Sequence, residues 1–123
     1  MKNPIRTLTA GIAGLGLALS VGGAAMAQQI SVATGGVAGV YYPLGGAMAE
    51  AWSAEVDGLT ATAESTGASV VNVRLIQGNE AEVAMVQNDI AFYAFNGDEM
   101  FEGDPLTNNL GLAMLYPEVI QIV

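Results

Sequence analysis

Residues that could bind a small polar molecule lie in three short segments of the sequence. Each segment follows a predicted strand and precedes a predicted helix. The first segment, residues 34–42, combines three glycines with Tyr41 and Tyr42. Glycines let a ligand approach the backbone closely, and tyrosine offers a flat face with a hydroxyl. The glycine spacing lacks the third glycine of a dinucleotide fingerprint and the lysine of a phosphate loop, so both of those sites are excluded.

The second segment, residues 65–69, carries hydroxyls at Ser65, Thr66 and Ser69 immediately before a predicted helix. A helix N-terminus presents free N–H groups and the positive end of a dipole, which suits a carboxylate. The same hydroxyls could instead simply cap the helix. The residues alone leave these two interpretations open.

The third segment, residues 86–89, places Gln87 at the end of a predicted strand, where its side chain could pair with a ligand amine or amide. Asn88 or Asp89 is expected to cap the helix that follows. Arg74 lies in the middle of a predicted helix, so an ion pair at the surface or within the fold suits it better than a carboxylate clamp.

The elements that position these segments alternate along the chain. Short β-branched or alternating stretches predict strands, and apolar residues at helical spacing, with glycine stops, predict helices. For the first helix the predicted apolar stripe is Leu44, Met48, Ala51 and Trp52. The predicted strands are residues 30–33, 59–63 and 82–86, and the predicted helices are residues 43–55, 69–78 and 88–95.

This order predicts an α/β fold with a parallel sheet and helices on both faces. Ligands of such sheets bind at the carboxyl ends of the strands, where all three polar segments should meet. A polar loop is expected over residues 98–109, then an apolar stretch over 110–115 and a strand over 119–123. Because that last strand ends the chain, we expect residues 28–123 to be most of the first lobe of a longer protein.

The first 27 residues have the features of an export signal. A basic start at Lys2 and Arg6 precedes an uncharged apolar stretch, and Ala25 and Ala27 supply the small-x-small cleavage pattern. A membrane anchor is the alternative, but the many glycines weaken such a helix. A cleavable signal peptide over residues 1–27 predicts a periplasmic protein.

Charge and composition exclude several classes of function. The 123-residue chain carries 12 acidic and 3 basic residues, and Arg74 is the one cation after residue 27. This charge repels phosphate backbones and anionic lipid, so we expect no nucleic-acid partner. Because the chain has no histidine and no cysteine, no metal site and no cofactor are expected, and neither is an enzyme.

Four segments together resemble a known receptor family. They read GVYYPLGG at residues 39–46, STGASVVNVRL at 65–75, AMVQND at 84–89 and LYPE at 115–118. The resemblance is to the TAXI subfamily of solute receptors that serve tripartite ATP-independent periplasmic (TRAP) transporters. It extends in order over almost all of the chain after residue 27.

The resemblance implies a type II periplasmic-binding-protein fold that closes on its ligand and docks on a TRAP-type membrane permease. The implied ligand is a small anionic or zwitterionic carboxylate such as glutamate, glutamine or a dicarboxylate. A ligand-sensing input domain of a signalling protein can share this fold and stays open as an alternative. Carried over by position, the ligand-facing residues are Gly36, Tyr41, Tyr42, Thr66, Ala68, Ser69, Gln87 and Asp89.

Overall fold

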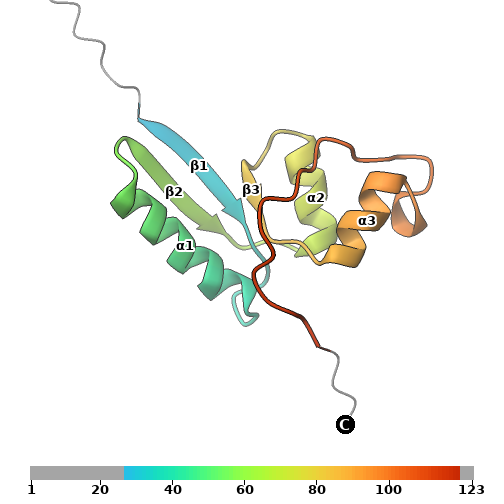
Figure 1. Cartoon of the computed structure of the whole chain (residues 1–123), viewed down its shortest axis with the longest axis horizontal. Helices are drawn as coiled ribbons and strands as arrows, with labels where there is room; N and C mark the ends of the chain where they lie inside the picture. The colour runs from blue at the N-terminus through green and yellow to red at the C-terminus, as the bar shows by residue number, and fades with distance from the viewer. Residues whose placement is uncertain (1–26, 120–123) are drawn as a thin grey trace, which may run out of the picture.

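The computed structural model describes residues 27–119, which form a small α/β unit (Figure 1). Strands and helices alternate along the chain, as the sequence predicts. The elements are β1 (Gln28–Ala33), α1 (Tyr41–Glu55), β2 (Leu59–Glu64), α2 (Ser69–Gln77), β3 (Val83–Ala84), α3 (Asn88–Asn96) and the 3₁₀ turn η1 (Glu99–Phe101).

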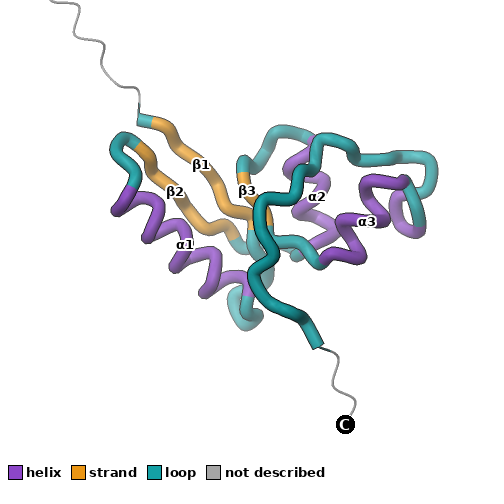
Figure 2. The backbone as a smooth tube through the Cα atoms, in the orientation of Figure 1, coloured by secondary structure: helices purple, strands orange, loops and turns teal. Residues whose placement is uncertain are grey.

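The strands form a parallel sheet in the order β2-β1-β3. The chain moves from β1 outward to β2 and then crosses back past β1 to β3. Because both crossovers are right-handed by rule, this reversal sends α1 and α2 to opposite faces of the sheet. Figures 1 and 2 show α1 beside β1 and β2, with α2 and α3 on the other side of the strands. The predicted fold class is confirmed.

Helix α1 packs on the sheet through its smallest residues. Gly45 and Ala49, one turn apart, are its buried positions. A Cβ at Gly45 would collide with the Thr34 side chain, so glycine is required for this close approach. The prediction that Ala51 belongs to the apolar stripe is wrong, since Ala51 is exposed. The face of α1 that lies against the sheet carries Gly45 and Ala49, and Ala51 lies off that face.

Strand β3 is shorter than predicted because side chains take over its hydrogen bonds. The Met85 N–H still donates to the Ala33 carbonyl at 2.9 Å, but the Met85 carbonyl accepts from Asn72. At the other end the Glu82 carboxylate accepts the Ser31 N–H at 2.7 Å. The strand pairing is therefore limited to Val83 and Ala84.

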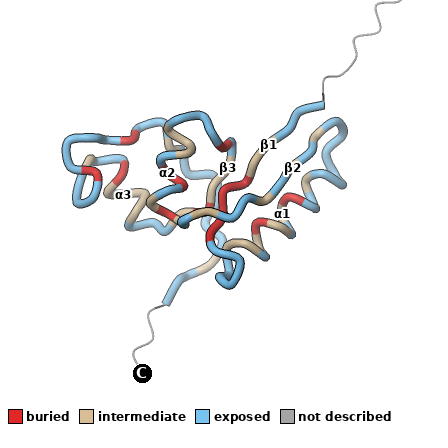
Figure 3. Tube along the Cα trace, turned by 180° about the vertical axis from the view of Figure 1, so that it is seen from behind, coloured by how far each residue is buried: buried red, intermediate tan, exposed pale blue. Residues whose placement is uncertain are grey.

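An apolar cluster joins α2 and α3 to the segment after them. Its buried members are Val73, Ala94, Phe101 and Leu106, and Figure 3 shows buried positions on these elements and along β1. Helix α3 ends where predicted, at Gly97, which adopts the left-handed conformation with φ 72°.

The segment after the cluster is irregular up to residue 119. The predicted apolar stretch there is exposed: Leu110 is 82 %, Leu112 81 % and Met114 93 % accessible. The segment passes β3 and descends toward the first turn of α1 (Figure 1). Of the predicted strand over residues 119–123, only Val119 is described, and it is irregular. The predicted signal over residues 1–27 lies outside the described residues except for Ala27.

Candidate functional site

The carboxyl ends of the three strands meet along one edge, which we call the rim: residues 34–41, 65–69 and 85–89. Hydrogen bonds tie the first two segments together. The Thr34 N–H donates to the Glu64 carbonyl at 3.0 Å and the Thr66 N–H to the Gly35 carbonyl at 3.3 Å. The Ser65 hydroxyl also donates to Gly35, at 3.0 Å. Two of the three polar segments therefore form one surface.

Asn72 holds the rim from within α2, and the sequence interpretation gave it no role. Its side chain is fully buried. Its amide donates to the carbonyls of Thr34 at 2.6 Å and Met85 at 2.7 Å, with the Ala33 carbonyl at 3.3 Å. Its side-chain oxygen lies 2.6 Å from the Thr66 hydroxyl. One asparagine thus bridges all three segments, and its spacing of three from Ser69 on one helix face was the available signal.

Ser69 fixes the third segment to the second. Its hydroxyl oxygen accepts the Gln87 N–H at 3.0 Å, and the residue is buried. Ser69 and Gln87, both predicted site residues, are therefore in direct contact.

The three α-helices of the described part all begin at this rim, and none has a side-chain cap. Their N-cap residues are Val40, Ala68 and Gln87. The capping interpretation of the second segment is wrong, because the hydroxyls of Ser65, Thr66 and Ser69 form hydrogen bonds with other groups of the rim and with Asn72 instead. The capping roles expected of Asn88 and Asp89 are also wrong, since both lie inside α3. The first N–H groups of a helix have no intrahelical acceptor, so the rim offers backbone donors.

Ala68 adopts a conformation that strains any residue with a Cβ. Its φ is 63° and its ψ is −155°, a region that is populated essentially by glycine and costs about 1–3 kcal/mol. Its N–H donates to the Thr66 hydroxyl oxygen at 3.1 Å, and its carbonyl accepts the first helical bond, from Asn72, at 2.9 Å. The strained bend sets the direction in which α2 leaves the rim.

Tyr41 opens α1 next to this bend. A Cβ at Gly35 would lie 3.4 Å from the Tyr41 Cβ and 3.6 Å from the Ala68 Cβ, so these two side chains flank Gly35. The pKa of Tyr41 is raised to about 12, chiefly by burial and also by the Glu118 carboxylate, while the Ser69 hydroxyl lowers it. The Tyr41 hydroxyl is therefore a protonated donor at neutral pH.

The remaining predicted site residues make fewer contacts. Gly36 is exposed and has open space where a side chain would be. Tyr42 is half-buried, and Gln87 and Asp89 are exposed. The Asp89 carboxylate accepts the N–H of its neighbour Ile90 at 2.8 Å. Gly36, Gln87 and Asp89 belong to the rim and Tyr42 borders it, but among these four only the Gln87 N–H makes a contact that joins two segments.

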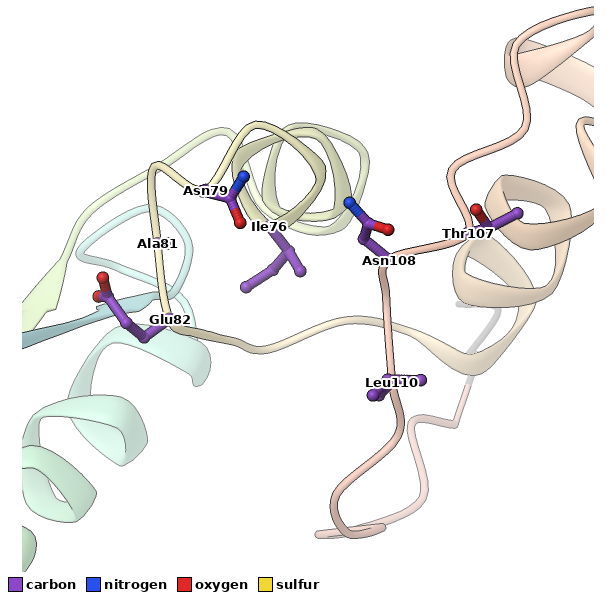
Figure 4. Close-up of a pocket in the computed structure, with 7 residues that line it drawn as sticks. All are labelled: Ile76, Asn79, Ala81, Glu82, Thr107, Asn108 and Leu110. Atoms are coloured by element: carbon purple, nitrogen blue, oxygen red, sulfur yellow. The ribbon is translucent and has the colours of Figure 1, made fainter.

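A separate hollow of about 470 Å³ lies at the opposite end of β3 (Figure 4). Glu82 marks its position, because it directly precedes β3, on the side away from the rim. None of the predicted site residues lines it. Its lining residues are Ile76, Asn79, Ala81, Glu82, Thr107, Asn108 and Leu110.

Arg74 does not reach the rim. Its guanidinium pairs with the Asp104 carboxylate at 3.0 Å and lies 5.0 Å from the centre of the Phe101 ring. The expected ion-pair role is confirmed. Within residues 27–119, no group of three acidic, histidine or cysteine residues could hold a metal ion.

The family model that matches this chain covers residues 32–123, from the end of β1 through the whole rim, and describes the NMT1-like family of periplasmic solute-binding proteins. The chain belongs to the NMT1-like family. The prediction of a solute-binding protein is confirmed at that level. Members of this NMT1-like family are typically extracytoplasmic, and no helix among the described residues is long and apolar enough to span a bilayer.

Proposed function

We propose that this NMT1-like protein captures a small anionic or zwitterionic carboxylate at the rim, without chemical change. The observation that carries the proposal is the set of uncapped helix starts around one sheet edge. A carboxylate that accepts the first N–H groups of α2 would satisfy donors that the described side chains leave open. Because Arg74 is engaged elsewhere, backbone amides supply the attraction.

Each rim residue has a part in this proposal. The ligand carboxylate sits at the start of α2, against the first backbone N–H groups of the helix and beside the Ser69 hydroxyl. Gln87 and Asp89 face the polar or amino end of the ligand, and Tyr41 and Tyr42 cover its carbons. Thr66 is a positioning residue, because its hydroxyl lies among the Thr34 carbonyl, Asn72 and the Ala68 N–H.

We further propose that the ligand is glutamate, glutamine or a related dicarboxylate, and that the receptor delivers it to a TRAP-type permease in the periplasm. Residues 1–27 would direct export and then be removed. Family membership supports a solute-binding role. The four sequence segments that resemble TAXI receptors support the more specific assignment.

The test is isothermal titration of the purified protein with L-glutamate, L-glutamine, succinate and 2-oxoglutarate. The decisive variant is Val71→Pro, because Val71 is exposed and lies in the first turn of α2, where proline removes an N–H that the helix does not need. A hydrogen bond to a charged group contributes about 1.5–3 kcal/mol. We therefore expect affinity for the bound carboxylate to fall about tenfold or more.

The matched control is Val71→Ala, which removes the same side chain and keeps the N–H. We expect its affinity to stay within about twofold of the parent. Equal affinity in the proline and alanine variants would exclude the Val71 N–H as a binding group. Absence of heat with every probe would overturn the proposed function.

A further inference from the structure

The side chains of the rim include carboxylates but no cation. The three rim segments contain one carboxylate, that of Asp89, and no lysine or arginine. Glu64, which directly precedes the second segment, adds a carboxylate at the border. Arg74 is the one cation among residues 27–119, and its guanidinium is paired with the Asp104 carboxylate at 3.0 Å. An anionic group of a ligand is therefore attracted by backbone N–H groups alone.

Asp89 lies close to the start of α2. The Gln87 N–H donates to the hydroxyl oxygen of Ser69, the first residue of α2, at 3.0 Å. Asp89 follows Gln87 by two residues, and two residues span at most about 7 Å of chain. The residue is exposed, and no ion pair among the described residues neutralises its carboxylate. The charge acts on a bound anion at this separation, because the Debye length at physiological salt is about 8 Å.

Glu64 lies at the border of the rim, on the same side of the sheet as α2. Exposed and half-buried side chains alternate along β2, and Glu64 belongs to the exposed set. Because α1 packs on the half-buried set, the exposed set faces the side on which α2 lies (Figure 2). Glu64 precedes Thr66 by two residues, and the Thr66 hydroxyl lies 2.6 Å from the side-chain oxygen of Asn72 on α2.

The first segment adds carbon rather than charge to the rim. Residues 36–40 are glycine, alanine and valine alone, and all are exposed. Val37 is 69 % accessible and Val40 62 %. A second carboxylate of a ligand would lose water against these side chains without gaining a partner.

We infer that the rim selects ligands with a single carboxylate, and that Asp89 and Glu64 are the residues that exclude a second one. This inference rests on the proposed carboxylate site at the start of α2. It narrows the proposed ligands to glutamine-like molecules, in which every polar group other than the carboxylate is neutral or cationic. Specificity of this kind comes from a repulsive element that the wrong ligand meets.

The experiment compares probes that differ in one charge and hardly in shape. L-Glutamine is titrated against L-glutamate, and succinamate, the monoamide of succinate, against succinate. The parent protein should bind the amide member of each pair about tenfold more tightly, a difference of about 1.4 kcal/mol. The preference should shrink at high salt, because screening weakens the repulsion.

Removing the repulsive charges should reduce this preference. Asp89→Asn and Glu64→Gln each keep the shape of the side chain, and each should lower the preference to about threefold in both pairs. The succinamate pair has no ammonium group, so its ratio reports repulsion alone. The matched control is Asp57→Asn, at an exposed residue between α1 and β2, at the end of the sheet away from the rim. It should keep the preference of the parent.

Adding the missing cation should have the opposite effect. Val40 and Val56 are both exposed and flank the two ends of α1. Val40→Lys should raise the affinity for glutamate and succinate about threefold or more relative to their amides. The control Val56→Lys places the same charge at the other end of a 15-residue helix, about 22 Å away, and should leave the preference unchanged.

The outcomes distinguish this inference from the proposed function. Equal affinity for both members of a pair, or tighter binding of the dicarboxylate, would overturn the inference and leave the carboxylate site standing. So would an undiminished preference in the double variant Glu64→Gln/Asp89→Asn. A parent protein that binds none of the four probes would overturn both proposals together.

Discussion

The rim and the apolar cluster are built on the same helix in different ways. Asn72 and Val73 are neighbours on α2 and both are buried, yet Asn72 bonds the rim carbonyls while Val73 packs in the cluster. Hydrogen bonds fix distance and direction, whereas apolar burial is non-directional. Substitutions in the rim should therefore change both the positions of its residues and the free energy of unfolding. Substitutions in the cluster should lower the free energy of unfolding alone.

The largest effect is expected at the centre of the polar network. Asn72→Ala removes the donor to the Thr34 and Met85 carbonyls and the partner of Thr66. An unsatisfied buried polar group costs about 1–3 kcal/mol, so we expect the free energy of unfolding to fall by about 3 kcal/mol or more. Urea unfolding followed by Trp52 fluorescence measures this loss. Affinity for the carboxylate probes should fall at least tenfold in the fraction that stays folded.

The next effect belongs to the cluster. Phe101→Ala removes a ring from a residue that is 1 % exposed and leaves a cavity. Such truncations lower the free energy of unfolding by about 3–5 kcal/mol when the site cannot collapse. We expect a loss near 3 kcal/mol, because the ring lies at the end of the fold, and no change in ligand affinity. Phe101→Leu, which keeps most of the volume, should lose less than half as much. A change in affinity in Phe101→Leu would break the proposed separation of the two regions.

The smallest effect is expected at the surface ion pair. Arg74 and Asp104 are 47 % and 65 % exposed, and exposed pairs contribute about 0–1 kcal/mol. Asp104→Asn should therefore lower the free energy of unfolding by less than about 1 kcal/mol, and less still at high salt. Unfolding at low and high salt measures it. A large loss, or a loss of ligand affinity, would mean that Arg74 supports the rim after all.

Element order and most helix ends could be predicted from the sequence because local signals fix them. Helix α1 ends at Glu55 before the Asp57-Gly58 turn, α2 before Gly78 and α3 before Gly97, each as predicted. The reversal of the chain past β1 is not local, but parallel strands separated by helices allow few other arrangements.

The features that periodicity missed depend on contacts between distant residues. Gly45 is buried because Thr34 lies against it, and no pattern within α1 reports that contact. Asn72 occupies a helix face that apolar spacing assigns to the core, and the carbonyls to which it donates lie 13 to 39 residues away. The hydroxyls of the second segment were candidate caps until their actual hydrogen-bond partners, in the first and third segments, were known.

The central claim is that a carboxylate binds to the backbone N–H groups at the start of α2. The most direct measurement is an NMR titration of the ¹⁵N-labelled protein with L-glutamate, following the amide signals of Ser69, Val70 and Val71 against those of Asn79 and Asn108 in the hollow. We expect saturable shifts in the α2 amides and in Gln87, with the hollow unchanged. Shifts confined to the hollow, or shifts at the rim that do not saturate, would contradict the account.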